Sequence, residues 1–188
     1  NRRSDQAEAA RPPRHLALDE LTFAPDVVAV ALPRLDQTAY LRAKLTNSSD
    51  EILLPGPVNL LREGALIGTA ELQTLAPGVE AEFGFGPIEG LRLTRQMPER
   101  AEGERGILTS SNQIEEKATL KIENKTGESW PVRLLDQVPY TEQEDLSISW
   151  SADPAPTETD VEGDRGLLAW EFDLAAGATK EIQLNHTI

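Results

Sequence analysis

Apolar and polar residues alternate with a period of two along most of this 188-residue chain. Because successive side chains of a β-strand point to opposite faces, this pattern is typical of strands that are buried on one face only. No convincing stretch repeats its apolar residues every 3.6 positions, as an amphipathic helix would. The sequence therefore predicts antiparallel strands. The clearest alternating runs are residues 39–45, 79–85, 118–122, 130–134, 146–150, 170–174 and 182–186.

The same alternation predicts which side chains form the core and which face solvent. The residues predicted to be buried are Leu120, Leu134, Trp150, Trp170 and Phe172. The residues predicted to be exposed are Glu80, Lys121 and Glu171.

Turn-forming residues separate the alternating runs. Arg62-Glu63-Gly64-Ala65 joins two apolar runs in the manner of a tight hairpin. Further turns stand at 76–78, 124–127 and 175–177, so that turns recur about every 8 to 15 residues, as in a sandwich or barrel. A helix capping box fits residues 141–144, but the alternating LSISW that follows leaves room for one helical turn at most. The predicted fold is an all-β, antiparallel β-sandwich of about eight to ten strands with little or no helix.

Two stretches rich in Gly and Pro are predicted to shape the ends of strands. Pro55-Gly56-Pro57 forms a rigid corner, for which we favour a strand start or a bulge over a ligand-facing loop. Gly84-Phe85-Gly86-Pro87 lacks the spacing and the following helix of a phosphate-binding loop, so it is interpreted as a strand end.

Length and composition predict one domain and limit its partners. Residues 1–14 are polar, with two prolines, and are interpreted as a flexible linker, which leaves 15–188 as the β-sandwich domain. With 18 Lys and Arg against 32 Asp and Glu, the formal net charge is −14, which disfavours binding to nucleic acid or to anionic lipid. No apolar run approaches the roughly 20 residues of a membrane span, so no membrane insertion is expected. The absence of cysteine excludes disulfides and thiolate chemistry.

The segment around Asp136 raises the question of catalysis. Pro139 cannot donate to a sheet and should end the preceding strand, while Asp136 can accept hydrogen bonds from nearby groups as the chain turns. A catalytic acid or base would need a partner, yet the two histidines, His15 and His186, lie near the ends of the chain, and no G-x-S-x-G motif is present. We therefore predict a connection between strands and assign no catalytic residue and no cofactor.

An acidic stretch at residues 152–166 is the one candidate for a metal site. Asp160, Glu162 and Asp164 have the spacing of the first ligands of a calcium loop, and Glu171 falls at its twelfth position. Arg165 occupies the position that requires glycine, and the flanks are strands rather than helices. We favour a solvated hairpin loop over bound calcium.

Two other patterns are compatible with function but have simpler explanations. Abundant carboxylates are consistent with a glycosidase, but the tryptophans at 130, 150 and 170 lie on alternating apolar faces and favour core over a sugar platform. The N-x-S/T triplets at Asn47, Asn124 and Asn185 are common by chance, and glycosylation is not favoured.

Several spaced segments resemble the bacterial mucoidy inhibitor A-like family, which is defined by a domain of unknown function numbered 4139. The segments are VAVALPRLDQTAYLRAKLTN (28–47), LLPGPVNLLREGALIGTAEL (53–72), LLDQVPYTEQEDLSISW (134–150) and RGLLAWEFDLAAGATKEIQL (165–184). The resemblance covers residues 15–188 and suggests the C-terminal part of the family's domain. It implies a β-rich, envelope-associated or periplasmic protein and brings no established reaction.

Two classes of function follow. The first is a non-catalytic structural or interaction domain that contacts other domains of its own full-length chain or an envelope protein. The second is a polysaccharide-binding or hydrolytic domain of the cell envelope, for which exposed aromatics beside carboxylates would be the distinguishing feature.

Overall fold

A computed structural model describes residues 20–97, 115–143 and 147–188. The predicted linker at 1–14 and His15 lie outside the described residues. Within them the chain is all-β, as predicted, with one short 3-10 helix, η1. The elements are β1 (Asp26–Ala31), β2 (Thr38–Thr46), β3 (Gly56–Arg62), β4 (Ala65–Leu72), β5 (Glu80–Gln96), β6 (Glu115–Asn124), β7 (Trp130–Gln137), β8 (Ser149–Asp153), β9 (Glu158–Thr159), η1 (Val161–Gly163), β10 (Leu167–Leu174) and β11 (Thr179–Thr187).

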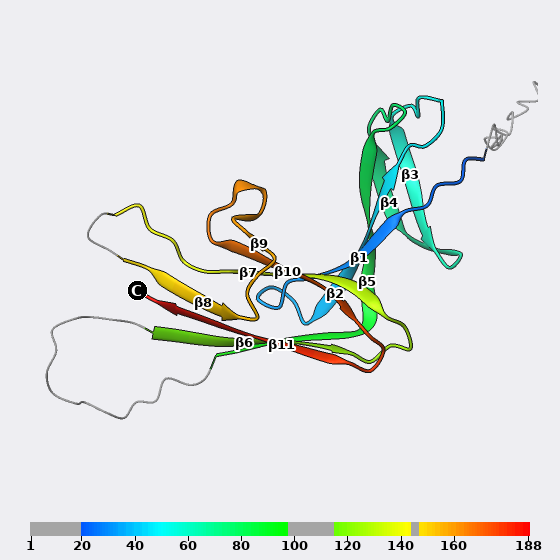
Figure 1. The fold of residues 1–188 in the computed structure, drawn as a ribbon. Coiled ribbons are helices and arrows are strands. Elements are labelled where there is room, and N and C mark those ends of the chain that lie inside the picture. The colour runs from blue at the N-terminus through cyan, green and yellow to red at the C-terminus, as the bar shows by residue number, and fades with distance from the viewer. Residues whose placement is uncertain (1–19, 98–114, 144–146) are drawn as a thin grey trace, which may run out of the picture.

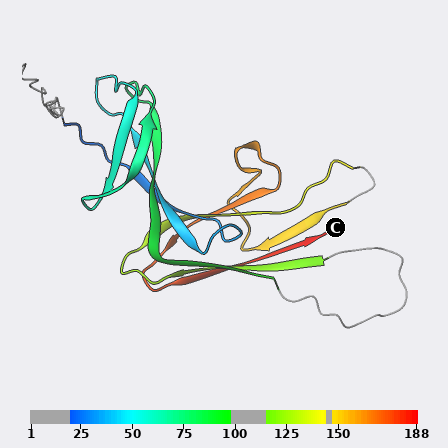
Figure 2. The ribbon, with the colours of Figure 1, turned by 180° about the vertical axis from the view of Figure 1, so that it is seen from behind.

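Nine of the strands form one sheet, in the order β8-β11-β6-β5-β2-β1-β7-β10-β9, and β3 pairs with β4 in a second sheet (Figure 1). The large sheet folds back on itself, so that β7 and β10 form one layer over β6 and β11. One pairing departs from the predicted antiparallel arrangement, because β1 runs parallel to β7 over Ala29–Ala31. Figure 2 shows the β3–β4 hairpin standing away from the two layers.

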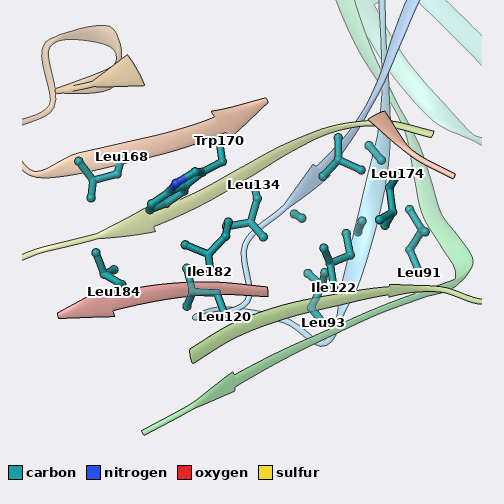
Figure 3. Close-up of a cluster of buried hydrophobic side chains, with 14 of the residues drawn as sticks. Leu91, Leu93, Leu120, Ile122, Leu134, Leu168, Trp170, Leu174, Ile182 and Leu184 are labelled. Carbon is teal, nitrogen blue, oxygen red and sulfur yellow. The ribbon is translucent and has the colours of Figure 1, made fainter. Parts of the chain in front are cut away.

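The core lies between these layers (Figure 3). Leu120, Leu134 and Trp170 are 0–2 % exposed, as predicted. Phe172 is half-buried against the same cluster. The prediction for Trp150 was wrong: it is 40 % exposed, because β8 is the edge strand of the sheet and no strand of the described residues lies on its outer side.

The predicted surface residues are mostly where the alternation placed them. Glu80 and Glu171 are exposed. Lys121 is half-buried instead: it lies on β6 between β5 and β11, and its amine is 3.2 Å from a carboxylate oxygen of Glu123.

The turn predictions are confirmed except at one position. The hairpin at 62–65 is present, with Glu63 and Gly64 at φ 53° and 81°, the signs required by a two-residue turn that matches the twist of the strands. β3 begins at Gly56, so the Pro55 corner is a strand start. The interpretation of residues 84–87 as a strand end was wrong: β5 continues to Gln96. A register shift opposite Tyr40–Arg42 and the φ of 77° at Gly86 mark a bulge that bends the strand without ending it.

Two parts of the chain share one arrangement of strands. In residues 38–96, β2 pairs with β5 and β3 with β4; in residues 115–187, β6 pairs with β11 and β7 with β10, all antiparallel. We call them the N-terminal unit and the C-terminal unit. The registers also agree, because Thr46 faces Glu80 just as Glu123 faces Thr179 at the corresponding end of each pair.

A buried asparagine follows the end of β2, the first strand of the N-terminal unit. Asn47 is 0 % exposed, and its Nδ2 donates to the carbonyl oxygens of Glu51 and Leu75 at 2.8 and 2.9 Å. Its Oδ1 accepts from the backbone N and the Oγ of Ser49 at 3.1 and 2.6 Å. The side chain therefore fastens the turn after β2 to the end of the β3–β4 ladder.

The C-terminal unit contains the same turn. Asn124 is 1 % exposed, and its Nδ2 donates to the carbonyl oxygens of Glu128, Leu174 and Ala175 at 2.7, 3.0 and 3.0 Å. Its Oδ1 accepts from the N and the Oγ1 of Thr126 at 2.9 and 2.7 Å. Both triplets thus serve as turns, and the folded state leaves neither amide accessible to a glycan.

Candidate functional site

The structure does not bring three side chains of the acidic stretch together as potential metal ligands. Asp160 Oδ1 accepts from the backbone N of Gly166 at 2.8 Å, which closes the loop around η1. Glu162 and Asp164 are exposed, and no group of three or more acidic or His side chains close enough to hold a metal occurs in the part of the chain that the structure describes. Glu171 instead contacts Arg133, which also pairs with Glu158 at 2.7 Å. The stretch is a hydrogen-bonded loop whose acidic residues are all exposed.

Asp136 is a buried anchor at the end of β7. It is 3 % exposed, and its Oδ1 accepts from the backbone N of Gln137 at 2.7 Å. Its Oδ2 accepts from Nε of Arg95 at 2.9 Å, where the Arg95 side chain is 16 % exposed. β7 ends at Gln137, before Pro139, as expected. The ion pair therefore ties the end of β7 to β5, a tertiary role that goes beyond the local turn predicted from sequence.

A cavity of about 650 Å³ opens at the end of the sandwich beside this ion pair. On its wall, His186 Nε2 lies 3.3 Å from a carboxylate oxygen of Glu116. Tyr140, 56 % exposed, supplies an aromatic ring. The full lining is Arg34, Arg95, Met97, Glu116, Gln137, Val138, Pro139, Tyr140, His186 and Ile188, with no Ser, Thr, Cys or Lys among these described residues. The described lining thus offers amide, guanidinium, imidazole, carboxylate and phenol groups.

The β3–β4 hairpin carries the second candidate surface. At its tip Leu61 and Leu66 face each other across the two strands and are 56 and 64 % exposed. At its base Leu54 is 78 % exposed, the largest value of the three. The exposed apolar residues of the hairpin and its flanks are Ile52, Leu54, Leu61, Leu66, Ile67 and Val79. We call this set the hairpin surface.

A family model described as a domain of unknown function, DUF4139, matches residues 8–188. The chain belongs to this family. No curated protein and no solved structure matched the chain.

This DUF4139 domain has two features that the sequence analysis did not predict. Sequence reasoning missed the hairpin surface, because Leu61 and Leu66 looked like ordinary members of apolar runs. It also missed the relation between the two units, although a signal was present: Pro57-Val58-Asn59-Leu60-Leu61 reappears as Pro131-Val132-Arg133-Leu134-Leu135, each after an Asn-x-Ser/Thr-x-Glu turn. Among the described residues, no helix is long and apolar enough to cross a membrane.

Proposed function

We propose that this DUF4139 domain is a non-catalytic interaction domain of a bacterial envelope-associated protein, and that it docks through the hairpin surface onto another domain of its own chain or onto an envelope protein. The envelope setting rests on the resemblance of four spaced segments to mucoidy inhibitor A-like proteins. The same resemblance supports a position in the C-terminal part of a longer family domain.

The observation that carries the proposal is the exposure of large apolar side chains on a hairpin that packs beside β5 and lies away from the layers of β6, β7, β10 and β11 (Figure 1). Single exposed leucines are ordinary, but apolar residues collected on one projecting element are typical of contact surfaces. The cross-strand pair Leu61–Leu66 is the most telling part, because two opposed leucines at a solvated hairpin tip gain little without a partner.

Site-specific photocrosslinking tests the proposal. A photoreactive residue at Leu66 of the full-length protein, expressed in its own bacterium, is expected to crosslink to one defined envelope protein or to another domain of the same chain. The matched control is the same residue at Glu181, an exposed position on β11. Equal crosslinking from both positions, or none from Leu66, would argue against docking through the hairpin.

The cavity at the end of the sandwich supports a second candidate, binding of an envelope polysaccharide. An exposed tyrosine beside amide, guanidinium and carboxylate groups is a combination that suits a sugar. Titration of the domain with envelope polysaccharide fragments would then shift the NMR signals of Gln137 and Tyr140, and Tyr140→Ala would abolish those shifts. Release of shortened fragments during the titration would add hydrolysis to binding.

A further inference from the structure

We propose that the free edge of β3 accepts an extended strand of a protein partner, which adds to the β3–β4 sheet parallel to β3. The inference rests on the proposed function, since it names how the partner of the hairpin surface would bind. The partner segment would carry small or β-branched apolar residues at alternate positions. It would be short, because only about three residues of β3 are suited to pairing.

The C-terminal unit shows how the corresponding edge is covered. There β7 pairs with β10 on one side and with β1 on the other. β1 runs parallel to β7, with Ala29 opposite Val132 and Ala31 opposite Leu134. The strand at this edge thus comes from outside the unit and has the sequence VAVA around the contact.

In the N-terminal unit the same edge has no partner. β3 and β4 form a sheet of two strands, so within the described residues nothing pairs with the outer side of β3. The motif Pro-Val-x-Leu-Leu places Val58 and Leu60 at the positions of Val132 and Leu134. A strand added here would therefore meet the same residue types that β1 meets on β7.

The apolar side chains of β3 are less buried than the corresponding side chains of β7, as expected if β3 lacks a neighbouring strand on its outer edge. Val132 and Leu134 are 2 and 0 % exposed. Val58 and Leu60 are only half-buried, although they face inward. An added strand would cover part of this remaining apolar surface and satisfy the unpaired backbone groups, which is the usual basis of recognition by strand addition.

The ends of β3 limit where a strand can pair. Pro57 has no N–H to donate, and a register irregularity follows Leu60. The free segment is therefore Val58–Leu60, the same length as the Val132–Leu134 segment that β1 occupies. So short a paired segment gives little sequence specificity. The side chains on either side of the paired residues would therefore have to select the partner.

The probe for a test is a synthetic peptide with the sequence of residues 26–32, DVVAVAL, followed by two lysines for solubility. Amide hydrogen exchange of the intact protein is followed by NMR with and without the peptide. The outward-facing amides of Val58–Leu60 should exchange rapidly in the free protein and slow by about tenfold or more with peptide. The amides of β7 should not change, because β1 already covers that edge. A scrambled peptide of equal composition and charge is the control.

Direction is tested with a nitroxide label at the N-terminus of the peptide. Parallel addition predicts stronger broadening of the Val58 amide, at the start of β3, than of the Leu61 amide near its end. The reverse gradient would overturn the parallel arrangement.

The remaining outcomes separate this inference from the proposed function. If millimolar peptide leaves β3 exchange unchanged while Leu66 still crosslinks to a defined partner, strand addition is overturned and the interaction role stands. If Leu66 gives no specific crosslink, the proposed function itself has failed. If the β3 amides become protected without peptide as protein concentration rises, a second copy occupies the edge, and the proposed heterologous partner is overturned.

Discussion

Asn124→Ala tests whether the repeated asparagine turn holds the β-sandwich together. The Nδ2 group lies within hydrogen-bonding distance of three carbonyl oxygens, but it has two protons, so about two full bonds are available. The Oδ1 atom accepts two more, both from Thr126. The substitution removes all four and leaves the carbonyl oxygen of Leu174 beside an apolar methyl group.

The expected cost follows from these bonds. At about 1 kcal/mol per net hydrogen bond, four bonds amount to about 4 kcal/mol, from which about 1 kcal/mol is recovered as side-chain freedom. We expect Asn124→Ala to lower the free energy of unfolding by about 3 kcal/mol. For a protein of this size that corresponds to a fall in melting temperature of about 6–12 °C. Asn124→Asp should be at least as damaging, because it places a carboxylate oxygen against the carbonyl oxygens.

Thermal unfolding followed by circular dichroism measures the effect, with urea titration as a second estimate. Asn185→Ala is the matched control, since Asn185 belongs to the third N-x-S/T triplet but lies half-buried within β11, and its substitution should cost less than about 0.5 kcal/mol. Asn124→Ala with the melting temperature of wild type would refute the role assigned to the turn.

Three further predictions concern the core, the buried ion pair and the acidic loop. Trp170→Ala should cost about 3–5 kcal/mol in a denaturant titration, whereas Trp150→Ala should cost less than about 1 kcal/mol; equal costs would contradict their difference in burial. Asp136→Ala should cost about 1–3 kcal/mol because it leaves Arg95 unpaired, and an unchanged melting temperature would instead favour a functional carboxylate. Calcium at about 1 mM should leave the melting temperature unchanged, whereas a site with a Kd of about 10 μM would add about 2.7 kcal/mol. A gain that Asp160→Asn with Asp164→Asn removes would restore the calcium site.

The alternation predicted the strands well because it is a local property, set by the directions of successive side chains. It predicted Trp170 correctly and Trp150 incorrectly for one reason: both lie on apolar faces, but burial depends on whether another strand covers that face. The parallel pairing of β1 with β7 could not be predicted from local sequence for a similar reason, since residues about a hundred positions apart meet only in the folded chain. The Arg95–Asp136 pair belongs to the same class of long-range contacts.

The relation between the two units was hidden by an insertion that preserves strand pairing. Pro57 follows Asn47 by ten positions, whereas Pro131 follows Asn124 by seven; on the returning strand, Gly78 follows Leu72 by six positions and Gly177 follows Leu174 by three. Each arm of the N-terminal hairpin is thus longer by three residues, and the ladder stays in register because Leu53 pairs with Leu75 at its base. An equal insertion on both arms moves the hairpin away from the turn that anchors it without changing any pair within it. That displacement accounts for a hairpin that packs beside β5, away from the layers of the C-terminal unit (Figure 1), while its counterpart, β7 and β10, is covered on both edges. It also explains why the unpaired edge and the exposed leucines occur in the N-terminal unit, where a partner strand can approach from outside.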